Sequence, residues 1–257
     1  MSTTADTSRP RGRVRIEPGS KRIRAYLGGE VVVDTTRPLL VWEVPYYPTY
    51  YFPAADVRTD LLLESDGGVS PSPSRGEGLT FTVAAGGKEA WGAALRYEDS
   101  PIEELNGLIR LEWGAMDAWF EEDEEVFTHP RDPYTRVDIL PSSRRVRVEV
   151  DGETIADSAS PRFVFETGAP VRHYIPKTHV RMELLTPTDT VSHCPYKGRA
   201  EYWSVRAGDA VHQDVAWSYP TPLPESQGIA GLIAFFDERV DTYVDGVRQE
   251  RPSSKFG

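Results

Sequence analysis

Hydrophobic and polar residues alternate along much of this chain with the period of β-strands. The clearest case is residues 145–150, Arg-Val-Arg-Val-Glu-Val, where every second residue is apolar, as in a strand with one buried face. Asp151 and Gly152 follow before apolar residues resume, so this pattern predicts a tight hairpin. Gly28 and Gly29 stand at the same point of a similar pattern near the start of the chain.

Other short apolar segments recur at close intervals, with Pro and Gly between them, and no amphipathic pattern extends over three helical turns. The segments that we expect to be strands are residues 39–42, 80–83, 163–165, 200–205, 229–236 and 240–244. Single helical turns are expected at Pro101 and Pro224, because proline suits the first position of a helix. Residues 67–78 are rich in Ser, Pro and Gly and predict an exposed loop. The pattern therefore predicts an all-β protein.

The chain also repeats itself. Residues 22–61 match residues 145–184 at a constant offset of 123 positions, and the offset becomes 122 further along. Pairs that are identical or similar include Arg22/Arg145, Gly29/Gly152, Glu43/Glu166, Tyr51/Tyr174, Arg75/Lys197, Gly76/Gly198, Val83/Val205 and Tyr97/Tyr219. A repeat of this length indicates a duplicated folding unit. We therefore predict two tandem, internally repeated, small antiparallel β-barrel or sandwich domains with little helix.

The repeat suggests domain boundaries. We expect a disordered tail at residues 1–11, a first β domain at 12–125, a packed linker at 126–141, a second β domain at 142–248 and a tail at 249–257. The linker contains aromatic, apolar and charged residues rather than Gly and Ser, so we expect it to pack against the domains.

Composition narrows the possible partners and compartments. The net charge of −11 argues against nucleic acid as a partner, because phosphate backbones require basic surface. No apolar run is long enough to span a membrane, and the first residues lack the apolar core of a signal peptide. The single cysteine, Cys194, excludes an internal disulfide and suits the cytoplasm. Residues 98–125 hold eleven carboxylates and one basic residue, which is typical of a solvated face or, alternatively, a docking surface for a basic partner.

The second repeat contains a recognisable motif. Residues 193–205 read His-Cys-Pro-Tyr-Lys-Gly-Arg-Ala-Glu-Tyr-Trp-Ser-Val, and residues 214–220 read Asp-Val-Ala-Trp-Ser-Tyr-Pro. Together they resemble the bacterial family called domain of unknown function 427. The first repeat resembles the N-terminal half of two-domain members through residues 37–43 and 50–53. The resemblance implies a compact β-rich fold and, mostly, cytoplasmic bacterial proteins. A nucleotidyltransferase-like label is sometimes attached to this family, which has no established general activity.

Residues that both repeats share can be explained by the fold, whereas residues present in only one repeat are candidates for chemistry. The shared cations Arg75 and Lys197 could pair with the shared acids Glu43 and Glu166, or they could bind an anion. The histidines, by contrast, are unevenly distributed. Four of the five lie in the second repeat, namely His173, His179, His193 and His212. Only the second repeat therefore has several groups that titrate near neutral pH.

Three hypotheses for function follow. In the first, the second domain, or the space between the domains, binds a small and anionic molecule, with Lys197 and His193 supplying positive charge. The residues expected to contact that ligand are Glu166, Tyr174, Tyr196, Tyr202, Trp203, Trp217 and Tyr219, although such aromatic residues also commonly fill a β core. In the second, the same site is catalytic: His193 acts as acid or base, Lys197 stabilises negative charge and Asp214 orients.

In the third hypothesis, the protein is a non-catalytic scaffold with an acidic docking face at residues 98–125. We predict no cofactor and no metal, since the histidines lack a spacing that would preorganise a ligand set. Cys194 is expected to be a buried structural thiol rather than a nucleophile. Exposed edge strands would permit a homodimer but do not require one.

Overall fold

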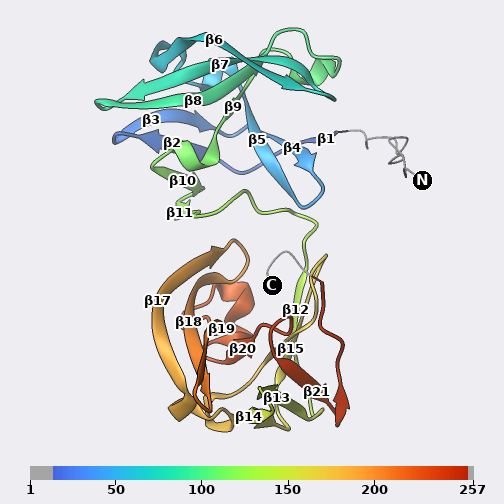
Figure 1. The fold of residues 1–257 in the computed structure, drawn as a ribbon. Coiled ribbons are helices and arrows are strands. Elements are labelled where there is room, and N and C mark those ends of the chain that lie inside the picture. The colour runs from blue at the N-terminus through green and yellow to red at the C-terminus, as the bar shows by residue number, and fades with distance from the viewer. Residues whose placement is uncertain (1–13, 254–257) are drawn as a thin grey trace, which may run out of the picture. The chain divides into compact units, whose positions relative to one another are not determined.

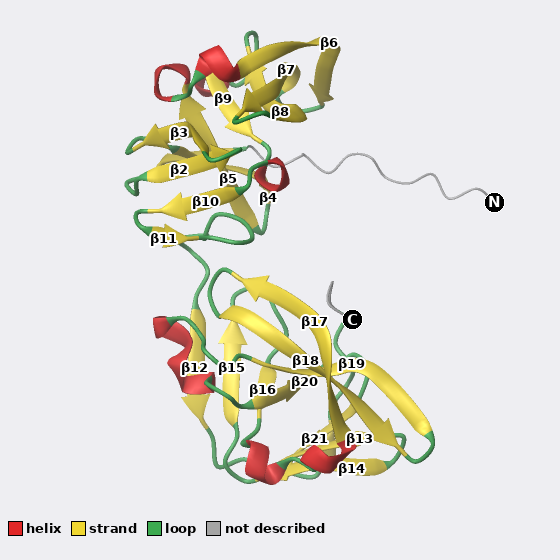
Figure 2. Ribbon diagram, turned by 90° about the vertical axis from the view of Figure 1, so that its left-hand side faces the viewer, coloured by secondary structure: helices red, strands yellow, loops and turns green. Residues whose placement is uncertain are grey.

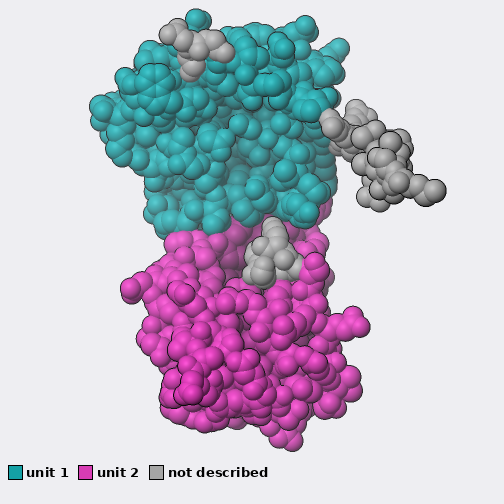
Figure 3. Space-filling model, in the orientation of Figure 1, with its two compact units in different colours: residues 1–132 teal, residues 133–257 magenta. Residues whose placement is uncertain are grey.

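A computed structural model describes residues 14–253, with residues 65–67 described by their backbone alone (Figure 1). The tail expected at residues 1–11 lies outside these residues, as does the end of the tail expected at 249–257. The chain forms two compact units, residues 1–132 and residues 133–257 (Figure 3). The boundary between them falls within the segment expected to be a linker.

The first unit contains a seven-stranded and a four-stranded sheet, both built from antiparallel pairs. The strands are β1 (Arg15–Pro18), β2 (Ile23–Leu27), β3 (Glu30–Thr35), β4 (Leu39–Val44), β5 (Tyr47–Pro53), β6 (Leu62–Ser72), β7 (Gly76–Ala85), β8 (Lys88–Tyr97), β9 (Leu108–Leu111), β10 (Ala118–Glu121) and β11 (Glu124–Glu125). The larger sheet has the order β1-β4-β5-β9-β8-β7-β6, and the smaller has the order β11-β10-β2-β3.

The second unit repeats this arrangement with its larger sheet divided. The strands are β12 (Val137–Pro141), β13 (Val146–Val150), β14 (Glu153–Ser158), β15 (Arg162–Glu166), β16 (Arg172–Tyr174), β17 (Leu185–Cys194), β18 (Gly198–Ala207), β19 (Ala210–Ser218), β20 (Ile233–Phe235), β21 (Asp241–Val244) and β22 (Val247–Arg248). They form sheets of order β12-β15-β16, β14-β13-β21-β22 and β17-β18-β19-β20. Strand β12 lies within the segment expected to be a linker.

Among residues 14–253, helix is confined to short 3-10 turns, so the predicted all-β class with little helix is confirmed (Figure 2). The turns are η1 (Ala54–Asp56), η2 (Thr59–Leu61), η3 (Glu103–Leu105), η4 (Trp113–Ala115), η5 (Lys177–His179), η6 (Met182–Leu184) and η7 (Pro224–Ile229). The turn predicted at Pro224 begins there, and the one predicted at Pro101 begins at Glu103. No described helix has the length and apolar character needed to cross a bilayer.

The predicted hairpins are present, and their backbone angles explain their residues. Asp151 and Gly152, between β13 and β14, have φ angles of 49° and 80°. Two successive positive φ angles define the type I′ turn, which matches the twist of paired strands. Gly28 and Gly29 adopt the same conformation, with φ angles of 59° and 79°.

Two sequence expectations need correction. The loop expected over residues 67–78 is wrong, because β6 and β7 continue their ladder there as far as the pair Ser72 and Gly76. Pro71 is tolerated because β6 is an edge strand, where a missing N–H does not break the sheet. The strand expected over residues 229–236 is shorter than predicted, since η7 extends to Ile229 and β20 comprises only Ile233–Phe235.

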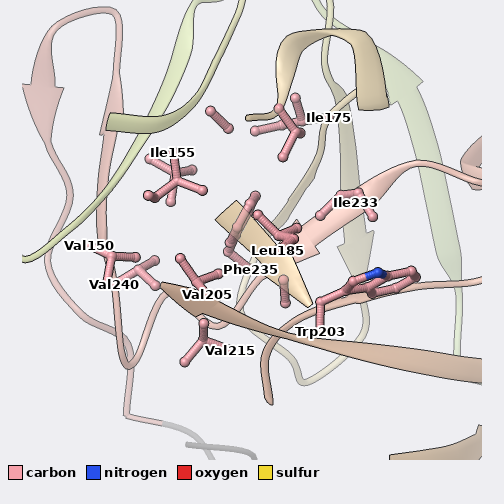
Figure 4. Packing of buried hydrophobic residues seen from close by; sticks show 14 of the residues in the cluster. Val150, Ile155, Ile175, Leu185, Trp203, Val205, Val215, Ile233, Phe235 and Val240 are labelled. Carbon is pink, nitrogen blue, oxygen red and sulfur yellow. The ribbon is translucent and has the colours of Figure 1, made fainter. Parts of the chain in front are cut away.

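Each unit has two clusters of buried apolar side chains, one on each face of its longest strands. In the second unit the larger cluster includes Trp203, Val205 and Phe235 (Figure 4). The smaller cluster includes Trp217 and Tyr219. The smaller clusters position the polar residues described next.

Candidate functional site

Lys197 is a buried cation in the smaller cluster of the second unit. It lies in the turn between β17 and β18, and only 7% of its surface is exposed. Its Nζ donates a hydrogen bond of 2.6 Å to Oε2 of Glu166, the last residue of β15. The side chain of Glu166 is 21% exposed, so this carboxylate joins the buried ammonium to the surface. The ion pair expected between these two residues is confirmed.

The surroundings of Lys197 keep it charged. Burial by itself lowers the pKa of Lys197, but interactions with Cys194 and Glu166 outweigh burial and raise this pKa above its ordinary value of 10.5. A protonated amine has no lone pair to attack an electrophile. Lys197 is therefore arranged to hold positive charge beside a carboxylate rather than to act as a nucleophile.

Tyrosine and tryptophan side chains surround the pair and form part of the core. Tyr174 Oη accepts a hydrogen bond of 3.0 Å from Nε1 of Trp217, and both side chains are buried. Burial raises the pKa of Tyr174 and that of Tyr219 well above the ordinary value for tyrosine. The half-buried Tyr202 shares a hydrogen bond of 2.7 Å with Ser192. Of the aromatic residues expected to contact a ligand, Tyr174, Trp217 and Tyr219 are enclosed by protein.

The corresponding cluster of the first unit contains two cations, Arg75 and Arg110, beside the acid Glu43. Glu43 accepts hydrogen bonds from Tyr51 and, at 3.1 Å, from Arg110, and it pairs with Arg75 at 3.5 Å. Arg75 also donates to Tyr97 Oη at 3.1 Å. The ion pair expected between Glu43 and Arg75 is therefore confirmed.

Arg110 was not predicted from the sequence. It lies in β9, opposite Leu95 in β8. The corresponding pair in the second unit is Ala234 in β20 opposite Trp217 in β19. Because the second unit has Ala234 where the first has Arg110, comparison of the two copies does not predict a second cation. Glu166 therefore pairs with one lysine, whereas Glu43 pairs with two arginines.

A surface depression of about 270 Å³ adjoins the pair of the second unit on the side of Glu166. Its wall consists of Arg136, Asp138, Phe165, Glu166, Thr167, Ala169 and Val171. Arg136 Nε donates to Asp138 at 2.8 Å, so the charges of these two side chains offset each other. Glu166 is the remaining charged residue of the wall, and the cation paired with it, Lys197, is buried. The depression thus combines a carboxylate with the partly exposed apolar side chains of Phe165 and Val171.

The three residues of the catalytic hypothesis do not meet. His193 is exposed on β17 opposite Arg199 of β18, whereas the backbone N–H of Asp214 contacts Ser204, five residues further along β18. The Asp214 carboxylate reaches Thr190, three residues before His193 on β17, and three strand residues span about 10 Å. Lys197 is near the His193 end of this sheet, but its Nζ is directed to Glu166.

Asp214 has a structural explanation. Its φ angle is 51°, and its carboxylate accepts hydrogen bonds of 2.7 and 2.8 Å from the hydroxyls of Thr188 and Thr190. Gly92, at the equivalent position of the first unit, also has a positive φ, of 62°. Asp214 thus occupies a left-handed position in a β-bulge, a conformation that Asp tolerates better than most residues.

The remaining predicted residues are dispersed. Trp203 packs in the larger cluster, on the opposite face from Tyr202, and the half-buried Tyr196 accepts a hydrogen bond at its carbonyl from Ser226. His179 contacts Ser158 at 2.9 Å, and His212 contacts Asp151 at 2.7 Å. Within the described part of the chain, no three His, Cys, Asp or Glu side chains come close enough to hold one metal ion.

The acidic segment of residues 98–125 is largely neutralised by nearby cations. The pairs are Glu98–Arg96, Glu112–Arg110, Asp117–Lys88, Glu121–Lys21, Asp123–Arg24 and Glu124–Arg131. In addition, Glu122 accepts a hydrogen bond of 2.8 Å from the backbone N–H of Arg22. Most of the segment is therefore held in local ion pairs, and a uniform acidic face is not formed.

Comparison with known proteins identifies one family. The family model described as domain of unknown function (DUF427) matches two tandem segments, residues 15–122 and 138–246. No curated protein sequence matches the chain significantly.

Proposed function

The chain belongs to the family of domain of unknown function 427 as a tandem pair, and we propose that its second unit binds a small polar molecule. The observation that carries the proposal is the position of Glu166, whose carboxylate lies between the buried Lys197 ammonium and the surface depression. A concave site with apolar walls and a few fixed polar groups is the usual form of a small-molecule site. Lys197 anchors Glu166, so that the carboxylate is fixed before a ligand arrives.

The walls favour one ligand chemistry. Lys197 is already paired with Glu166, so a ligand in the depression meets a carboxylate acceptor rather than a free cation. A molecule that offers an amine or another hydrogen-bond donor to Glu166, with an apolar part against Phe165 and Val171, matches these walls. The anionic ligand expected from the sequence stays a prediction, and the experiment below includes it.

Binding is favoured over acid–base catalysis by the arrangement of the predicted residues. A general acid or base must reach its partner within about 3 Å, directly or through one water. The Asp214 carboxylate is held at Thr188 and Thr190 of β17, and His193 lies three residues beyond Thr190, about 10 Å along the strand, so this geometry gives the two groups no direct contact.

A thermal-shift screen tests the proposal with two compound sets, small amines and small carboxylates or phosphates. The full chain is compared with Glu166→Gln, and Glu43→Gln serves as the matched control at the equivalent position of the first unit. Each variant's shift is measured from its own melting temperature without ligand, since ligand binding raises that temperature by mass action.

We expect an amine that stabilises the full chain and Glu43→Gln equally but stabilises Glu166→Gln much less. Two results would overturn the proposal. One is the absence of any stabilising compound in either set. The other is a compound whose effect is unchanged by Glu166→Gln. A hit confined to the anionic set and lost in Lys197→Ala would instead support the anion-binding hypothesis.

A further inference from the structure

A larger groove lies in the first unit, and neither Glu43 nor Arg75 is among the residues that line it. Its volume is about 430 Å³. Its walls are formed by Val14, Arg15, Ile16, Pro101, Ile102 and Glu104. One wall is therefore β1 with the residue before it, and the other is the start of η3 with the residues before it. The groove has an apolar floor and one acidic wall residue.

The second unit shows how this position can be filled. The residue equivalent to Ile16 is Ile139 in β12, where η7 covers it so closely that a Cβ on Gly228 would lie 2.8 Å from Ile139 Cγ2. Turn η7 has six residues, whereas η3 has three. Tyr97 and Asn106 bridge in the first unit, as Tyr219 and Ala230 do in the second, so the connection is two residues shorter in the first unit. The groove therefore corresponds to the place of the additional turn.

Strand β1 borders the groove and is the edge of the seven-stranded sheet. It pairs with β4 on one side, through residues Arg15 to Pro18. No described strand pairs with its other side. An edge of this kind presents backbone donors and acceptors to which an extended peptide can add as a further strand.

The segment that borders the groove carries unneutralised negative charge: Glu104 lines the groove, and Asp99 and Glu103 lie close to the lining residues in sequence, so the three are called the rim. Asp99, Glu103 and Glu104 are exposed, and among residues 14–64 and 68–253 none of their carboxylates has a hydrogen bond or an ion pair. They differ in this from most acids of residues 98–125. Arg15, the cation in the wall, is paired with Glu17 at 2.5 Å and lies over the ring of Trp42. The charge at the rim thus complements a basic ligand.

We propose that this groove binds an extended basic segment of a partner protein, which adds as a strand to β1. Side chains of a strand alternate between two faces. Apolar side chains of the segment would occupy the floor beside Ile16 and Ile102, and its arginine or lysine residues would lie against Glu103 and Glu104. This surface is separate from the small-molecule site proposed for the second unit, so either proposal can fail without the other.

The test is fluorescence anisotropy with a labelled nine-residue peptide of alternating arginine and valine. Two further peptides replace all arginines by glutamate or all valines by serine. The full chain is compared with the double variant Glu103→Gln/Glu104→Gln. The matched control is Glu64→Gln/Glu89→Gln, which removes the same charge from exposed residues of β6 and β8, outside the segment that borders the groove.

We expect the groove variant to weaken binding of the arginine–valine peptide by roughly fivefold, as two exposed ion pairs of about 0.5 kcal/mol each predict. The control variant should stay within about twofold of the full chain, and the other two peptides should bind more weakly. Hydrogen exchange should slow at residues 15–17 when the peptide binds.

Equal losses in the groove and control variants would overturn the proposal, as would unchanged exchange at β1. Sedimentation without peptide gives a separate check. Self-association of the full chain that is lost in Glu103→Gln/Glu104→Gln would identify a second copy, rather than a basic partner segment, as the occupant.

Discussion

Replacing Lys197 by methionine should destabilise the second unit far more than the equivalent change, Arg75→Met, destabilises the first. Removing one partner of a buried ion pair costs about 3–5 kcal/mol, because the other charge remains buried and unpaired. Glu166 is partly exposed and can regain some hydration, so we expect a loss at the lower end, about 3 kcal/mol. In the first unit Glu43 keeps Arg110 and Tyr51 as partners, and we expect a loss of about 1 kcal/mol.

Hydrogen exchange followed by mass spectrometry suits this comparison, because it reports the opening free energy of each unit separately. Peptides from β18 should lose protection in Lys197→Met, and peptides from β7 should lose less in Arg75→Met. The double variant Lys197→Met/Glu166→Leu removes both charges and should recover most of the loss.

Equal losses of stability in the two single variants would contradict a buried, unpaired Glu166 as the cause. Failure of Glu166→Leu to recover stability in the Lys197→Met background would contradict it as well. In that case the loss would come from packing of the lysine chain and not from an unpaired carboxylate.

Three further predictions concern single positions. Because the folded-state pKa of Lys197 is raised, its contribution to stability is present below the ordinary pKa of 10.5 and is lost as the pH rises through the folded-state value. The difference in unfolding free energy between the full chain and Lys197→Met, measured by denaturation, should therefore shrink above about pH 10.5. Asp214→Gly should be more stable than Asp214→Ala by about 1 kcal/mol in urea unfolding, because glycine tolerates the positive φ that alanine does not, as Gly92 illustrates. Gly228→Ala should lower the free energy of unfolding by about 1–2 kcal/mol through overpacking against Ile139. In an Ile139→Ala background, adding Gly228→Ala should cause little further loss in the same assay.

The sequence predicted those features that are encoded locally or twice. The period of residues 145–150 and the Asp151-Gly152 pair specify β13, β14 and the turn between them without reference to the rest of the chain. The shared acid and cation of each repeat predicted the ion pair of Glu166 and Lys197. Such residues can be found by comparing the two copies, because both units retain them.

Features that depend on strands distant in the sequence were not accessible in this way. Arg110 reaches Glu43 only because β9 lies between β5 and β8 in the sheet, and nothing in the sequence around Arg110 indicates that order. The separation of His193 from Asp214 likewise follows from the register of β17, β18 and β19. Short spacing along a chain therefore did not predict proximity across the sheet.

The two units share one fold but differ in charge at one cross-strand pair. In that pair a larger side chain on one strand is matched by a smaller one on the other. The larger side chain in the first unit is Arg110, opposite the smaller Leu95; in the second unit the larger is Trp217, opposite the smaller Ala234. Total volume is roughly conserved across the pair, which is the kind of change that a packed core tolerates. The exchange removes one cation, so Glu166 is held by Lys197 where Glu43 has both Arg75 and Arg110. With one cation fewer, the carboxylate of Glu166 has spare acceptor capacity next to a depression, which is why we propose small-molecule binding for the second unit.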